Sequence, residues 1–160
     1  MRLLVLSPAI ALAVACVTAC HSSDTPADAD EALACIASGR GDTYVAGLEH
    51  LGKLGLLDVK LMTADPAPPG FNNNVWVIQV NAMAAGAVGD PVNDASVVVT
   101  PFMPDHQHGT PIRAQVEALS GGQYKLSPIN LWMPGYWELT IDVTAGAVHD
   151  SVVYKFCIQA

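Results

Sequence analysis

Short runs of alternating apolar and polar residues recur along the chain from about residue 57 onward. In residues 136–144, for example, Trp137, Leu139 and Ile141 occupy alternate positions. A period of two, interrupted by turns rich in Pro and Gly, predicts β-strands. Strands are expected at residues 57–62, 75–81, 96–103, 113–119, 123–126, 136–144 and 151–157. Seven short strands predict an all-β fold, a single immunoglobulin-like antiparallel β-sandwich.

One segment does not follow this pattern. In residues 44–54 the spacing of Tyr44, Leu48 and Leu51 suits a helix. Gly47 and Gly52 each weaken a helix by about 1 kcal/mol, so the pattern leaves this segment undecided. Elsewhere no helical run of 10–15 residues alternates with the strands. A doubly wound α/β fold is therefore disfavoured.

The N-terminal residues predict export. Arg2 precedes an apolar run that ends at Ala19, which is typical of a secretory signal peptide over residues 1–19. The following Cys20 completes a Val-Thr-Ala-Cys sequence that resembles the processing site of bacterial lipoproteins. This resemblance implies lipidation of Cys20 and a membrane-anchored lipoprotein facing the periplasm or cell surface. Cys16 is a poorer candidate, and ordinary cleavage after Ala19 is the alternative.

Residues 20–34 are expected to form a flexible tether between the anchor and a domain at residues 35–160. They are rich in Ser, Asp, Ala and Pro and show no apolar periodicity. Such a composition cannot bury a core.

Two properties of the chain after Cys20 restrict its partners and its folding. Six basic residues against fifteen acidic ones give a net charge of −9, which excludes nucleic acid as an expected partner because binding it needs clustered Lys and Arg. Only Cys35 and Cys157 remain as cysteines, and such a pair in an exported protein usually forms a disulfide. Closing a loop of roughly 100 residues stabilises a fold by about 5 kcal/mol in the chain-entropy model.

The candidate chemistry lies in residues 101–111. This stretch holds Met103, His106 and His108, and a second Met before a Pro occurs at Met133. In an extended chain the two His share a face. Two imidazoles with one or two thioethers suit copper, especially Cu(I). Asp105 is placed to orient one imidazole from outside the ligand set. The alternative is that both Met are core residues and that His106 caps a turn.

Two motifs carry a resemblance to a known family. The segments MPDHQHG and MPGYWELTI, with a G-x-Y-x-L hairpin between them, resemble the YtkA-like domain, which is related to the FixH-like proteins. The resemblance covers residues 75–157. It implies an immunoglobulin-like sandwich in an exported bacterial protein, and its relatives are linked to copper handling and cytochrome oxidase assembly. The family usually has Gly where this chain has Gln107, which leaves the direction of the His pair open.

Sequence signatures of enzymes are absent. The chain has no G-x-S-x-G, no H-E-x-x-H and no Gly-rich phosphate loop after a strand, so we expect no enzyme activity. Two functions are compatible with the sequence. The first is an exported lipoprotein that binds or delivers copper in the periplasm. The alternative is a non-catalytic module, without metal, that presents loops or a sheet edge to another envelope protein.

Overall fold

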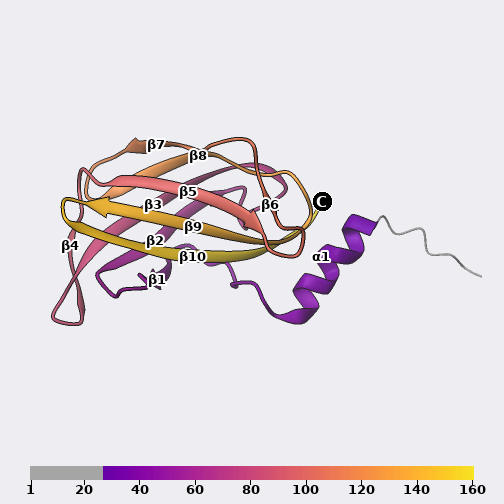
Figure 1. Ribbon diagram of the computed structural model, residues 1–160, viewed down its shortest axis with the longest axis horizontal. Helices are drawn as coiled ribbons and strands as arrows, with labels where there is room; N and C mark the ends of the chain where they lie inside the picture. The colour runs from indigo at the N-terminus through magenta and orange to yellow at the C-terminus, as the bar shows by residue number, and fades with distance from the viewer. Residues whose placement is uncertain (1–26) are drawn as a thin grey trace, which may run out of the picture.

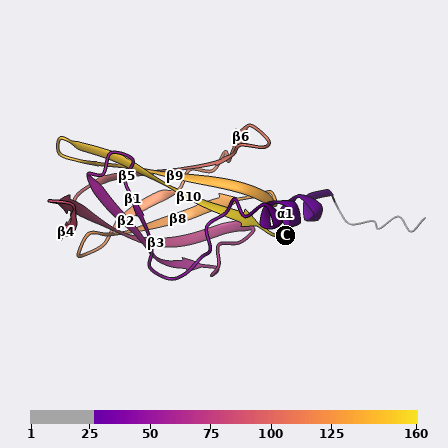
Figure 2. The ribbon, with the colours of Figure 1, turned by 90° about the horizontal axis from the view of Figure 1, so that it is seen from below.

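Two antiparallel β-sheets packed face to face make up most of the structure, a computed structural model that describes residues 27–160 (Figures 1 and 2). The elements are α1 (Ala27–Ser38), β1 (Leu48–Leu51), β2 (Leu57–Asp65), β3 (Asn72–Ala84), β4 (Ala87–Pro91), β5 (Ser96–Met103), β6 (His108–Gly109), β7 (Gln115–Ala118), β8 (Gln123–Leu131), β9 (Gly135–Ala145) and β10 (Val148–Ile158). One sheet has the order β1-β2-β3-β8-β7, with β4 also paired to β3, and the other has the order β10-β9-β5-β6. The predicted all-β sandwich is confirmed.

All seven predicted strands are present, with ends that differ by a few residues. They are β2, β3, β5, β7, β8, β9 and β10. The additional strands β1, β4 and β6 are short, and β6 has only two residues. The undecided segment 44–54 contains β1, which pairs antiparallel with β2. Pairing with β2 provides hydrogen-bond partners for the backbone N–H and C=O groups of β1. A helix weakened by Gly47 and Gly52 would provide them less well.

The core lies between the two sheets and is built from alternate residues of the long strands. In β9 the inward positions Trp137, Leu139, Ile141 and Val143 are completely buried, while the intervening residues 138, 140 and 142 remain partly exposed. Trp76 of β3 meets Tyr154 and Phe156 of β10 edge-on across the interior. Each large apolar side chain buried in this way contributes about 1.5–3 kcal/mol, which fixes the register of the strands.

Helix α1 lies at the end of the sandwich where β10 finishes (Figure 1). The predicted disulfide joins Cys35 of α1 to Cys157 of β10, with Cα atoms 5.7 Å apart. The prediction of irregular structure is wrong for residues 27–34, which are helical. The helix is rich in Ala, a strong helix former, and within residues 30–38 it buries Ala32 and Cys35, a stripe too short to be recognised from the sequence. The predicted signal peptide and Cys20 lie outside the described residues.

Asp150 fixes the other end of the sandwich. It is 2% exposed, and its carboxylate accepts hydrogen bonds from the backbone N–H groups of Leu54, Leu56, Leu57 and Ser151 at 2.8–3.3 Å. Burial alone raises the pKa of the Asp150 carboxyl, but these donors outweigh it and hold the pKa below its usual value. Asp150 thereby fastens the β1–β2 turn to β10. Within residues 27–160, no helix has the length and apolar character that crossing a membrane requires.

Candidate metal site at one end of the sandwich

His106 and His108 lie at the same end of the molecule as α1, where β5 turns back into β6 (Figure 2). The turn places His108 directly opposite Met103 in the antiparallel register. Gln107 adopts a left-handed conformation with φ of 56°, the region that favours Gly. Its side-chain amide donates a hydrogen bond to the Pro104 carbonyl, which compensates for the unfavourable backbone. Replacing the usual Gly by Gln therefore leaves the turn with a positive φ.

The His108 ring is held in one orientation. Its Nδ1 lies 3.1 Å from the carbonyl oxygen of Gly109. A carbonyl only accepts hydrogen bonds, so in the neutral ring Nδ1 carries the proton and Nε2 keeps its lone pair. The ring stacks on Trp132 at a centroid distance of 5.1 Å and meets Trp137 edge-on at 6.3 Å. This is the usual arrangement of a His ready to bind a metal through Nε2.

The His106 ring lies beside that of His108, with centroids 5.7 Å apart and planes tilted by 53°. Its Nε2 is hydrogen-bonded to Oε1 of Glu31, which projects from α1. The contact joins residues that are 75 positions apart in the chain. Glu31 belongs to the segment that the sequence predicts to be a tether, and no local pattern in the sequence marks it as a neighbour of the His pair.

Met103 is completely buried, yet it is also a neighbour of the site. Directly opposed residues of an antiparallel pair project from the same face, so Met103 and His108 are side by side. The Met103 methyl group also approaches Gly135, where an added Cβ would lie 2.9 Å from it and 3.3 Å from Glu31. Gly135 therefore lies next to both Met103 and Glu31. Glu31 in turn contacts His106.

Met133 is half-buried and packs against the core, and its carbonyl accepts a 2.8 Å hydrogen bond from the Trp137 indole. The core interpretation therefore describes both Met residues well. Met103 is a core residue that also lies opposite His108 in the strand register.

Among residues 27–160, the side chain that hydrogen-bonds to Asp105 is Arg40, and neither imidazole does so. Arg40 binds its carboxylate through both guanidinium nitrogens, with Nη1 2.9 Å from Oδ1. The side-chain hydrogen bond from Arg40 holds the pKa of the Asp105 carboxyl below its usual value. The guanidinium also lies 4.3 Å above the ring of Tyr136. Asp105 thus connects the β5–β6 turn to the segment that follows α1, and Glu31 lies beside an imidazole.

The donor set of the site is small. Among residues 27–160, no group of three or more His, Cys, Asp and Glu side chains is arranged to hold a metal ion. The candidate donors are the two imidazoles and the thioethers of Met103 and Met133. This mixture of borderline and soft donors fits copper better than magnesium or calcium, which require oxygen ligands.

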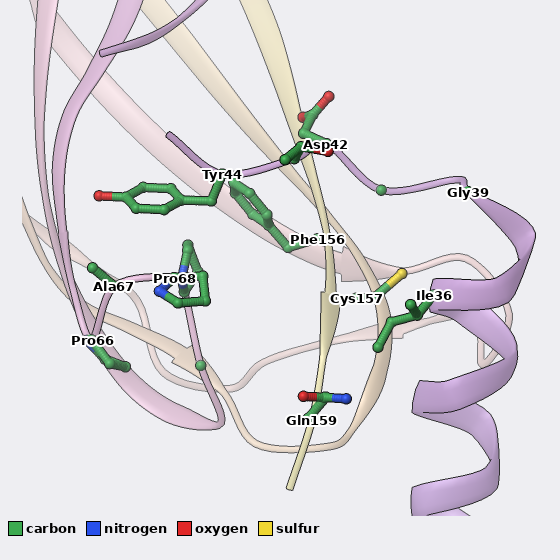
Figure 3. A pocket seen from close by; sticks show the side chains of 14 residues that line it. Ile36, Gly39, Asp42, Tyr44, Pro66, Ala67, Pro68, Phe156, Cys157 and Gln159 are labelled. Carbon is green, nitrogen blue, oxygen red and sulfur yellow. The ribbon is translucent and has the colours of Figure 1, made fainter. Parts of the chain in front are cut away.

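A separate cleft of about 550 Å³ lies between the segment after α1 and the Pro66–Gly70 loop (Figure 3). Figure 3 shows Tyr44 and Phe156 on one side of it and Pro66 and Pro68 on the other. None of the predicted ligands lines this cleft. The candidate metal ligands and this cleft therefore lie in different parts of the protein.

A family model described as YtkA-like matches residues 55–142, more than half of the chain. The chain belongs to the YtkA-like family. The match includes all four predicted ligands, whereas α1, Glu31 and both disulfide cysteines lie outside it. The structure is also similar to a crystal structure of a DUF4426 family protein from Pseudomonas aeruginosa PAO1, with 18% identity, 70% of this chain and 96% of that chain covered, and a TM-score of 0.44. Comparison with curated proteins found no match.

Proposed function

We propose that this YtkA-like protein is an exported lipoprotein that binds copper in the periplasm and delivers it there. The observation that carries the proposal is the pair of adjacent imidazoles, His106 and His108, with the Nε2 lone pair of His108 left free by the hydrogen bond to Gly109. Two neighbouring imidazoles at a half-exposed turn provide a metal with both donors and access from solvent.

The expected ligands have distinct roles. His106 and His108 suit both oxidation states of copper, while a thioether favours Cu(I). Met103 is the better placed thioether because it opposes His108, and Met133 is the second candidate. Glu31 shares the Nε2 atom of His106 with any incoming ion. Copper bound at His106 Nε2 therefore requires the Glu31 contact to open.

The proposal of export rests on different residues. The signal-like residues 1–19 and the Val-Thr-Ala-Cys sequence predict lipidation of Cys20. The Cys35–Cys157 disulfide supports an oxidising compartment, since structural disulfides are rare in the cytosol. Cys20→Ser is expected to release the protein from the membrane fraction. A membrane-bound Cys20→Ser protein, or an unmodified N-terminus in the wild type by mass spectrometry, would refute lipidation.

Competition titration against a Cu(I) chelator tests copper binding, with the mature chain carrying Cys20→Ser as the parent. We expect one Cu(I) per chain at submicromolar affinity, and loss of binding when His106→Ala and His108→Ala are combined. His149→Ala is the matched control, because His149 is an exposed histidine whose ring contacts the Thr144 hydroxyl. Met103→Leu is expected to weaken Cu(I) more than Cu(II), with circular dichroism to verify the fold.

Two results of this titration would contradict copper binding at His106 and His108. Wild-type affinity weaker than about 1 μM, or a double His variant that binds as well as its parent, would exclude this site. The protein would then be better explained as a metal-free interaction module of the cell envelope.

A further inference from the structure

Strand β5 has an open edge. It pairs with β9 from Ser96 to Phe102, but on its other side it pairs with β6 only at Phe102 and Met103. Residues 96–101 therefore have no strand partner on that side among the described residues. Such an edge exposes backbone donors and acceptors that can pair with another chain.

The direction of the free backbone groups follows from Gly109. A Cβ added to Gly109 would lie 2.7 Å from the Pro101 carbonyl oxygen, so this carbonyl faces β6 and not β9. Backbone direction alternates along a strand, so Val97 and Val99 also turn their N–H and C=O groups to the open side. No turn, loop or side chain within residues 27–160 forms a hydrogen bond with these groups. Two residues thus offer complete backbone pairing sites.

A cleft of about 480 Å³ runs along this edge. It lies between Val97–Pro101 of β5 and the segment 110–114, which leads from β6 towards β7. An extended residue fills roughly 160 Å³ at strand and sheet spacings of about 3.3, 4.8 and 10 Å, so the cleft has room for about three residues. Val98 and Ile112, which are 54% and 43% exposed, provide apolar contacts at its two walls.

The charges of the cleft indicate what its occupant contains. Strand β5 carries no charged side chain, although natural sheet edges are commonly protected by charges, Lys in particular. Arg113 is the one charged residue that lines the cleft. No carboxylate of residues 27–160 forms a salt bridge with Arg113. An acidic group on the occupant would complement it.

We propose that the open edge of β5 binds an extended segment of a partner protein as an added strand. The segment pairs with the backbone of Val97 and Val99, places apolar side chains against Val98 and Ile112, and directs a carboxylate to Arg113. This interaction uses none of the copper ligands. It is therefore independent of the proposed metal site.

The test uses short fluorescein-labelled peptides of alternating Val and Thr that carry one Glu at different positions. Matched sets carry Lys in place of Glu, or N-methyl groups on alternate amides, which prevent strand pairing. Fluorescence anisotropy with the mature chain carrying Cys20→Ser is expected to show micromolar binding of a Glu peptide, and at least about tenfold weaker binding of the Lys and N-methylated peptides.

Variants of the protein locate the interaction. Val98→Lys is expected to weaken the Glu peptide at least about tenfold, since Lys is a natural block on sheet edges. Arg113→Glu is expected to reverse the preference, so that Lys peptides bind better than Glu peptides. Lys125→Glu makes the same charge change on β8 of the other sheet and is expected to leave binding unchanged. All three positions are exposed, and circular dichroism verifies their folding.

Amide hydrogen exchange provides a readout at single residues. The bound peptide is expected to slow exchange of Val97 and Val99 at least about tenfold, while Val98 and Thr100, already paired with β9, change little. No peptide binding at about 1 mM, or binding that survives N-methylation, overturns the proposal. A dimer in analytical ultracentrifugation that Val98→Lys dissociates also overturns it, because a second copy would then fill the edge.

Discussion

The sandwich has one end that carries α1 and another where β9 turns into β10 (Figure 1). Carboxylates stabilise each of these ends in a different way. At the α1 end, Glu31 binds His106 and Arg40 binds Asp105, and all four side chains are 28–42% exposed. At the other end, Asp150 is buried and accepts its hydrogen bonds from backbone N–H groups.

This difference separates an adaptable region from a fixed one. Partly exposed polar pairs of this kind contribute about 0–1 kcal/mol each, so they can open at little cost. When a buried carboxylate moves away from its backbone donors, several N–H groups lose their hydrogen-bond acceptor, which costs much more free energy. The candidate metal site therefore lies where the contacts are easily exchanged, and the loop of Asp150 supports the framework.

The largest expected effect comes from Asp150→Ala. Removing the carboxylate leaves the N–H groups of the β1–β2 turn without acceptors, and we expect a loss of about 3 kcal/mol or more in the free energy of unfolding. Urea denaturation measures it. Asp142→Ala, on the outer face of β9, is the matched control and should cost less than about 0.5 kcal/mol. Equal effects at both positions would contradict the role of Asp150.

The same contact predicts how stability depends on pH. Because the pKa of Asp150 is lower in the folded protein than in the unfolded chain, its stabilisation is complete above the unfolded pKa of about 3.9. It is lost as the pH falls below that value and through the folded pKa. Between pH 5 and pH 2, wild type should lose more stability than Asp150→Asn. Parallel pH profiles for the two proteins would argue against this linkage.

Gly135→Ala is expected to have an intermediate effect of about 2 kcal/mol. Gly135 has φ of 122°, and an added Cβ would press on the Met103 methyl group at 2.9 Å. Gly86→Ala is the control, since Gly86 has φ of 81° with nothing within 4 Å of the added Cβ. Thermal unfolding of both variants separates the contact from the backbone strain. If Gly86→Ala proves as costly as Gly135→Ala, Met103 does not pack as described.

Glu31→Ala is expected to have the smallest effect, below about 1 kcal/mol, because the Glu31–His106 pair is partly exposed. The neighbouring Asp30→Ala, at an exposed position of the same helix, is the matched control. Chemical denaturation of both variants distinguishes them, since Glu31 is hydrogen-bonded to His106. A loss of several kcal/mol for Glu31→Ala would show that the α1 end is as rigid as the Asp150 end.

The sequence by itself determined the features that depend on local pattern. Alternation in residues 136–144 predicted β9 because a strand with one buried face requires it. Cys35 and Cys157 could be paired because no other cysteine follows Cys20. His106 and His108 were expected as neighbours because only one residue separates them.

Only the tertiary structure decided which distant residues surround those features. Helix α1 was missed because two buried positions make no recognisable stripe, and its Glu31 reaches His106 across 75 residues of chain. Asp105 meets Arg40 across 65 residues, a partner that no local pattern in the sequence indicates. Asp150 gains its role only when the β1–β2 turn packs on β10. Local sequence specifies which face of a strand is buried, whereas the packing of sheets and helix specifies which side chains meet at their ends.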